Sequence, residues 1–379
     1  AMALGLLAGC GGQPAASGDK DTVVVYIGDI FNSMTPYMTT ANSDQAVFDQ
    51  VYETLTVTKD DGTVAPCLAK SWKMSDDSLE YTFQLEEGVK FHNGEVMTAD
   101  DVVYSFEQYI ANPAKNNFVS MIDKVEMVDA NTVKVTLNKV TPLFLVYINE
   151  LPILNKKFVE EHNGNISDVA CGTGPYKLTS IDLATSAMLE RNDDYRLAPA
   201  AIEKVELRYV GDRSTASVQL ETGDLDIMSI DPSQLVSFEN NDKFTVEKVQ
   251  TLKTALLAIN TTVAPLDNKL VRQAMTYAVD KQSIITIAYE NCAVPARLQA
   301  NDTNCFGVDF SDATDFSYNP EKAKELLAEA GYPNGLNFAD YGIQMDVLGG
   351  TYMEKAAQVM QQNFADVGIT IELRTTSTP

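Results

Sequence analysis

The sequence predicts an α/β chain that folds into more than one lobe. Its 379 residues exceed the roughly 250–300 residues at which a single hydrophobic core stops growing. Segments with strand-like alternation take turns along the chain with segments of helical spacing, which favours open sheets covered by helices. Hydrophobic residues make up 45% of the chain and charged residues 21%, a balance typical of globular proteins.

The first predicted element is a buried strand over residues 23–27, because this run is apolar and β-branched. A helix is expected over residues 43–55, in which apolar residues recur at helical spacing. Residues 55–64 then predict a hairpin that turns at residues 59–62. Alternating apolar and polar residues at positions 81–85 predict the next strand.

A capping box predicts the start of another helix, since Thr98 is followed three residues later by Asp101. The helix is expected to end before Pro113, because the residue before a proline avoids the helical conformation. Residues 125–137 predict a second hairpin, which turns at residues 129–131.

The second half of the chain continues the alternation of strands and helices. The expected elements are a strand at 205–210, a helix at 215–221, a strand at 224–230, a helix capped by Asp267, a helix from Asn319-Pro320 to Gly331, a helix at 351–367 and a strand at 369–373.

Charge and histidine content exclude several classes of function. Twenty-eight Lys and Arg residues against 53 Asp and Glu residues give a formal net charge of −25. A nucleic-acid partner is therefore not expected, because binding one requires a basic face. The only histidines are His92 and His162, too few for a three-histidine zinc site, and their settings favour a turn and a helix end over a catalytic triad. We expect no enzyme activity, no metal and no cofactor.

The N-terminus predicts a lipid anchor. Leu7-Ala8-Gly9-Cys10 resembles the bacterial lipobox, in which the cysteine becomes the lipidated first residue of the mature protein. A tether of small and polar residues follows at positions 11–20. At the other end the chain stops after a strand, without a closing helix. We interpret the sequence as a fragment cut at both ends.

The four other cysteines are Cys67, Cys171, Cys292 and Cys305. An even count in an exported protein favours two disulfides, for which three connectivities exist. Cys292 and Cys305 flank a short loop-like stretch, so we expect this pair, with Cys67–Cys171 as the second. The alternative is four free, buried thiols.

Several stretches, taken in order, carry a resemblance that runs from about Thr22 to the end of the chain. The most specific is residues 98–105, and the others are residues 51–55, 68–72, 81–85 with 88–95, 172–176, Asn260, 271–274 and 318–320. Through these stretches the chain resembles the family 5 solute-binding lipoproteins of bacterial ABC importers, which take up peptides, nickel complexes and related solutes.

The resemblance implies a two-lobe periplasmic-binding-protein fold, type II-like, with an extra small α/β domain. The lobes of such proteins close on the ligand about a hinge. Mapped onto this chain, residues 1–21 are a signal-peptide remnant, lipobox and tether, 22–52 and 177–252 form lobe I, 53–176 form the extra domain, and 253–379 form lobe II, which is truncated at its C-terminus.

The resemblance also implies ligand contacts, because peptide binders of this family hold the ligand backbone like an added strand. The matching positions are Thr40, Ala41 and Asn42 alongside the peptide, Phe118 on a wall of the extra domain, Thr254 after the crossing into lobe II, and Tyr352 as a polar contact. Phe118 is equally compatible with a core position, and Tyr352 with an ordinary helix start. The aspartate that pairs with the peptide amino terminus in relatives lies beyond this chain.

The function expected from these observations is capture without chemistry. A monomeric protein outside the cytoplasm, anchored to the membrane by its lipid, would bind a peptide-like solute and deliver it to the transmembrane subunits of an ABC permease. The alternatives are a carrier of a nickel chelate or another non-peptide solute, a sensory or chaperone protein, and a secreted hydrolase.

Overall fold

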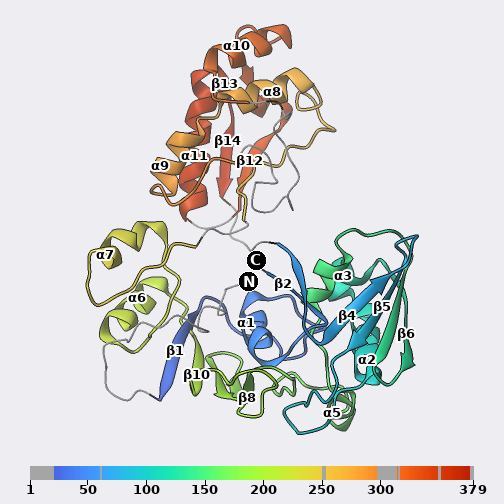
Figure 1. Cartoon of the computed structure of the whole chain (residues 1–379). Coiled ribbons are helices and arrows are strands. Elements are labelled where there is room, and N and C mark those ends of the chain that lie inside the picture. The colour runs from blue at the N-terminus through green and yellow to red at the C-terminus, as the bar shows by residue number, and fades with distance from the viewer. Residues whose placement is uncertain are drawn as a thin grey trace. The chain divides into compact units, whose positions relative to one another are not determined.

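The structure is a computed structural model (Figure 1), which describes residues 21–59, 62–249, 253–296, 314, 316–348 and 351–375. The chain divides into two compact units, Ala1–Ser229 and Ile230–Pro379. The domain boundaries implied by the family resemblance stay a prediction. Cys10, Cys305 and residues 60–61 of the expected first hairpin turn lie outside the described residues.

The first sheet of unit 1 joins the start of the chain to a segment about 150 residues later. Its strands, in spatial order, are β1 (Thr22–Ile27), β10 (Lys204–Tyr209), β9 (Ser186–Arg191) and β8 (Tyr176–Asp182). β1 is parallel to β10, and the other pairs are antiparallel. The strands predicted around residues 23–27 and 205–210 are therefore confirmed.

The strand predicted over residues 224–230 is wrong. This segment contributes only an isolated bridge between Ile227 and Val25. Asp226 turns its side chain onto β1, where Oδ2 accepts a hydrogen bond of 2.8 Å from the Val24 N–H. A carboxylate thus takes the donor that a neighbouring strand would have used.

Helix α1 (Asn42–Val51) follows β1, and the hairpin of β2 (Thr56–Thr58) and β3 (Val64–Pro66) comes next. The predicted helix over residues 43–55 is too long, because Tyr52 is already extended, with φ −114° and ψ 160°. Leu55 is fully buried in the core although it lies outside the helix.

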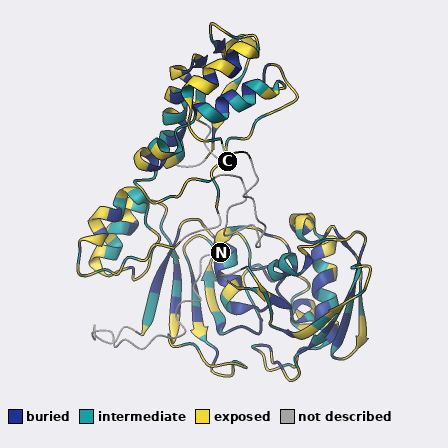
Figure 2. Ribbon diagram, turned by 45° about the horizontal axis from the view of Figure 1, so that its top comes forward, coloured by how far each residue is buried: buried dark blue, intermediate teal, exposed yellow. Residues whose placement is uncertain are grey.

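The second sheet of unit 1 is antiparallel, with the strand order β4 (Ala69–Met74), β5 (Glu80–Leu85), β7 (Thr132–Leu137) and β6 (Ile122–Asp129). β5 alternates as predicted, and its buried side chains face the core. Figure 2 colours the buried residues of the chain dark blue. α2 (Ala99–Ala111) packs against β6 and β7. Its capping box is present, since the Thr98 N–H donates to Asp101 Oδ2 at 2.9 Å, and it ends before Pro113 as predicted.

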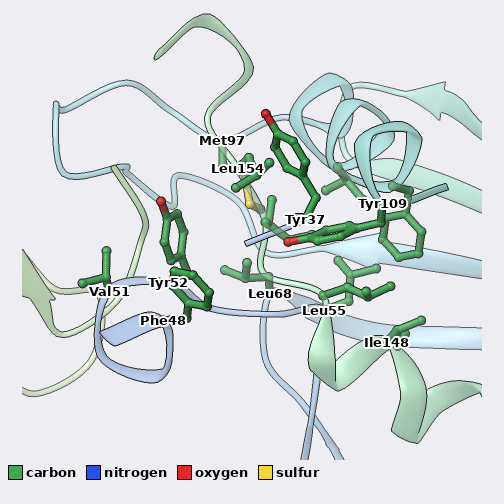
Figure 3. Close-up of a cluster of buried hydrophobic side chains, with 14 of the residues drawn as sticks. Tyr37, Phe48, Val51, Tyr52, Leu55, Leu68, Met97, Tyr109, Ile148 and Leu154 are labelled. Atoms are coloured by element: carbon green, nitrogen blue, oxygen red, sulfur yellow. The ribbon is translucent and has the colours of Figure 1, made fainter. Parts of the chain in front are cut away.

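One hydrophobic cluster runs through both sheets of unit 1. Figure 3 shows its aromatic centre, where the rings of Tyr37 and Tyr109 meet edge to face at 6.4 Å and those of Phe48 and Tyr52 at 6.0 Å. The remaining short elements of unit 1 are η2 (Pro113–Lys115), α3 (Asn116–Val119), α4 (Phe144–Tyr147), η3 (Ile148–Glu150), α5 (Lys156–Glu161) and α6 (Arg213–Thr222).

Unit 2 has its own core between helices and short parallel strand pairs. Its elements are η4 (Pro232–Gln234), α7 (Leu235–Glu239), α8 (Lys269–Ala278), α9 (Lys281–Ala288), α10 (Pro320–Glu329), β11 (Leu336–Asn337), η5 (Phe338–Tyr341), β12 (Gln344–Val347), α11 (Thr351–Asp366), β13 (Ile369–Thr370) and β14 (Glu372–Thr375).

Two boundaries in unit 2 differ from the prediction. Asn268, and not Asp267, caps α8, since Asn268 Oδ1 accepts a hydrogen bond of 2.9 Å from the Leu270 N–H. The predicted strand at 369–373 is two strands that pair with different partners, β13 with β11 and β14 with β12. The predicted cap at Asn319 and stop at Gly331 of α10 are confirmed. Within the described ranges, no helix has the length and apolar character needed to cross a membrane.

Candidate functional site

A buried carboxylate organises the loop before α1. Asp44 has no exposed surface. Its Oδ1 accepts a hydrogen bond of 2.7 Å from the Asn32 N–H, and its Oδ2 accepts from Thr39 Oγ1 at 2.7 Å and from the Ser33 N–H at 3.3 Å. Hydrogen bonds to a charged acceptor are among the stronger ones in proteins. Asp44 therefore holds both ends of the loop segment 32–39 against the helix.

Thr39 links Asp44 to the backbone of Ala41, one of the predicted contact residues. The Thr39 hydroxyl, which donates to Asp44, also accepts a hydrogen bond of 3.1 Å from the Ala41 N–H. Thr39 is buried, whereas the side chains of Thr40 and Asn42 are exposed. Because these hydrogen bonds fix the backbone at 39–41, the exposed Thr40 lies on a rigid segment.

An open depression lies over this loop. It is lined by Asn32, Ser33, Met38, Thr39, Thr40, Ala41 and Ala114. Two of the predicted contact residues, Thr40 and Ala41, thus border the same hollow as Ala114 of η2, a segment more than 70 residues away. Asn42 is exposed at the first position of α1 and is not one of the lining residues.

Phe118 lies in α3, one helical turn beyond Ala114, and is half-buried. Its ring meets that of Tyr147 edge to face at 6.2 Å, and the Lys115 ammonium lies 5.7 Å from its centroid. Phe118 packs against the core cluster of unit 1. The structure therefore gives this residue a core role on one side and leaves part of its ring accessible.

Thr254 and Tyr352 belong to unit 2. The Thr254 hydroxyl is enclosed and has no hydrogen-bond partner among the described residues. Tyr352 is 40% exposed, and its ring lies 5.5 Å from that of Tyr289. Their roles as ligand contacts stay predictions.

Sequence reasoning missed a buried ion pair. Glu53 is 8% exposed. Its Oε1 accepts hydrogen bonds from Arg196 Nη2 at 2.7 Å and from Tyr195 Oη at 3.0 Å. The partners lie more than 140 positions apart, so no local pattern pointed to them. This pair joins the segment after α1 to the segment after β9.

The expected Cys67–Cys171 disulfide is wrong, because both residues are free thiols in the structure. Cys67 Sγ faces Glu53 Oε1 and Arg196 Nη2, each at 3.6 Å. Burial and the Glu53 carboxylate raise the pKa of Cys67 to about 12. Cys171 lies beside the backbone of Asn93 and His92, and burial raises its pKa to about 11. Cys292 is exposed and is likewise a free thiol. This contradicts the expected pair with Cys305, a residue that lies outside the described ranges.

Both histidines bond to backbone and pack locally. His92 lies between Gly172 and Gly174, and burial lowers its pKa to about 4. His162 closes α5, where its Nδ1 lies 2.7 Å from the Phe158 carbonyl oxygen and its ring lies 4.2 Å from the Phe158 ring. In the part of the chain that the structure describes, no cluster of three or more His, Cys, Asp or Glu residues is placed to hold a metal ion.

Comparison with known proteins supports one family. A model described as "Bacterial extracellular solute-binding proteins, family 5 Middle" matches residues 63–379. The chain is 31% identical over 357 residues to Heme-binding protein A of Haemophilus influenzae, covering 86% of this chain and 65% of that protein. It is 30% identical over 365 residues to Glutathione-binding protein GsiB of Pectobacterium atrosepticum, covering 93% of this chain and 69% of that protein.

Solved structures agree with this match. The periplasmic binding protein DppA of Helicobacter pylori in complex with peptide STSA has a TM-score of 0.76 at 27% identity, covering 94% of this chain and 74% of that one. NikZ of Campylobacter jejuni in complex with Ni(L-His) has a TM-score of 0.76 at 26% identity, covering 95% of this chain and 74% of that one. The chain spans about two thirds to three quarters of the length of these relatives.

Proposed function

Because the chain belongs to the bacterial extracellular solute-binding proteins of family 5, we propose that it captures a peptide-like solute outside the cytoplasm and delivers it to an ABC permease. It would do so without chemical change to the solute. The observation that carries the peptide assignment is the hydrogen-bonded loop 32–41, which borders an open depression with backbone and small polar side chains.

A loop held in this way can form one wall of a peptide-binding site. An extended peptide is recognised through its backbone when a receptor presents a fixed edge of backbone groups, and roomy surroundings then tolerate varied side chains. Asp44 fixes the loop before any ligand arrives, so little conformational entropy is lost on binding. The wall residues in this proposal are Thr40, Ala41, Asn42 and Phe118. Thr254 and Tyr352 are proposed as further ligand contacts.

The same proposal includes lipid anchoring at Cys10, a monomeric state, and the division into lobes I and II with an extra domain. A tri-acylated or di-acylated cysteine anchors a protein stably, whereas a single chain does so only marginally. Intact-mass measurement of the membrane-extracted protein tests the anchor, since lipidation at Cys10 adds the mass of acyl chains and removes residues 1–9.

A thermal-shift screen on the full-length protein tests the solute class. The probes are a pool of short peptides, nickel chelates, haem and sugars. At a ligand concentration of about 100 times Kd, binding stabilises the folded state by about 2.7 kcal/mol, which moves the unfolding midpoint by a few degrees. We expect peptides to produce this shift.

The outcomes separate the candidates. A shift with nickel chelates or haem and none with peptides contradicts the peptide assignment and establishes a non-peptide carrier of the same family. If no probe shifts the unfolding midpoint, the result contradicts solute capture and favours a sensory or chaperone role.

A further inference from the structure

Unit 1 contains a buried lysine that forms no ion pair with a described residue. Lys115 of η2 is 2% exposed, although lysine is almost never fully buried unless it is paired. Among the residues that the structure describes, its ammonium has no hydrogen bond and no ion pair within 4.0 Å. Its one close partner is the face of Phe118, at 5.7 Å from the ring centroid.

This arrangement is unfavourable in the ligand-free chain. Desolvation of an ammonium is costly unless a carboxylate or several acceptors compensate, and an aromatic face compensates only in part. Burial accordingly lowers the pKa of Lys115, and the Glu150 carboxylate, which forms no ion pair with it, raises this pKa by less than burial lowers it. A lysine kept in this setting is preorganised for an anion, because pairing would recover part of that cost.

The position of Lys115 supports a role toward the solute. Its neighbour Ala114 lines the depression together with Thr39, Thr40 and Ala41, and its stacking partner Phe118 is a predicted wall residue. The described polar side-chain atoms that are both fully enclosed and unpartnered are Tyr52 Oη, Thr173 Oγ1, Gln219 Oε1 and Thr254 Oγ1. The unpartnered Lys115 nitrogen is not among them, so it keeps a share of the small surface that this residue exposes.

We propose that the Lys115 ammonium, which lies over the Phe118 ring and follows Ala114 of the depression in sequence, pairs with a carboxylate of the bound solute. The inference rests on the proposed function and specifies it further: the preferred solutes are acids. The carboxylate is either the C-terminus of a peptide or an acidic side chain. The alternative is a purely structural lysine, whose carbon stem fills space next to Phe118 and whose charge has no bearing on ligand choice.

The test compares three peptides on full-length protein by calorimetry: tetra-alanine, tetra-alanine amide, and the same amide with one alanine replaced by aspartate. Wild-type protein should bind at least one of the two acids, tetra-alanine or the aspartate-containing amide, at least about tenfold more tightly than tetra-alanine amide, as expected for a desolvated charge pair. Tighter binding of tetra-alanine alone identifies the C-terminus, and tighter binding of the aspartate-containing amide identifies a side-chain carboxylate.

Variants link the preference to Lys115. Lys115→Met keeps the stem and removes the charge, and it should bring the ratio of acid to amide affinity close to one. Lys115→Gln repeats the test should the methionine variant fold poorly, and Lys115→Arg should retain the preference. Lys139→Met, which removes an exposed lysine of the same unit, should leave the ratio unchanged. A structural lysine would alter thermal stability or all affinities equally, and would not change the ratio.

The two proposals fail in different ways. Wild-type protein that binds the peptides without preference for acids overturns the Lys115 inference, and so does a preference that survives in Lys115→Met and Lys115→Gln. In both cases peptide capture stands. Wild-type protein that binds none of the peptides overturns peptide capture and the Lys115 inference together.

Discussion

The imidazole Nε2 of His92 lies 3.0 Å from the carbonyl oxygen of Gly174, across 82 positions of sequence. On the other side of the ring, Nδ1 lies 3.3 Å from the Gly172 nitrogen and accepts its N–H. A neutral imidazole protonated at Nε2 satisfies both contacts, because one nitrogen must donate and the other must accept. Gly174 in turn donates its N–H to the Val51 carbonyl at the end of α1, at 2.9 Å. His92 thus ties the turn at 92–94 to the glycine segment and, through it, to α1.

Protonation of His92 should destabilise unit 1. Burial lowers its pKa to about 4, against about 6.5 in an unfolded chain. The unfolded state therefore binds more protons between these values, so stability is present above about pH 6.5 and is lost as the pH falls toward 4. Between pH 7 and pH 5, wild-type protein should lose about 1–2 kcal/mol more unfolding free energy than His92→Gln.

Urea unfolding at the two pH values measures this difference. His162→Gln is the control, because that ring sits at the end of α5 and should leave the wild-type pH dependence in place. Identical pH dependence in wild-type and His92→Gln protein would show that the imidazole does not carry the effect.

Replacing Gly172 should disrupt the same junction through sterics. A Cβ at this position would overlap the Val51 carbonyl oxygen and lie 2.7 Å from the carbonyl carbon. The end of α1 would have to move, so Gly172→Ala should cost at least about 3 kcal/mol. The matched control is Gly28→Ala, whose Cβ would meet no atom closer than 3.5 Å and should change stability by less than about 0.5 kcal/mol. Thermal unfolding of both variants decides the matter, and equal midpoints would contradict the predicted clash.

Local signals explain which elements could be predicted. The capping box at Thr98 and the cap at Asn319 act within a few residues of themselves, so sequence alone locates those helix starts. The segment 224–230 shows where this fails: its alternation suits a strand, but Asp226 bonds to a residue 202 positions away. A hydrogen bond between residues so far apart in the sequence cannot be predicted from a local residue pattern.

The candidate site, like the fold, could be predicted from the sequence only in part. Family resemblance pointed to Thr40 and Ala41, which do border the depression. It could not reveal the support beneath them, because the role of Asp44 depends on a loop that folds back over the helix start. Lys115 was missed for a similar reason, since burial of a lysine follows from tertiary packing and not from composition.

Removing the Asp44 carboxylate should loosen the wall loop. Asp44→Ala leaves the N–H groups of Asn32 and Ser33 and the Thr39 hydroxyl without their acceptor. Unpaired buried donors cost about 1–3 kcal/mol each, offset in part where water enters, so a loss of about 2–4 kcal/mol in unfolding free energy is expected. Asp29→Ala, which removes an exposed carboxylate nearby, should be nearly neutral. Denaturant unfolding of both variants makes the comparison, and a neutral Asp44→Ala would contradict the role assigned to this carboxylate.

The thiols of Cys67 and Cys171 should resist alkylation in the folded protein. Thiolate is the reactive form, and burial raises the pKa of these two groups to about 12 and about 11. At pH 8, iodoacetamide should therefore leave both unmodified in native protein and modify both after unfolding in urea, without any reductant. Peptide mapping by mass spectrometry reads out each site, with the exposed Cys292 as the internal comparison. If Cys67 and Cys171 accepted the label only after reduction, they would be joined in a disulfide and the free-thiol arrangement would be wrong.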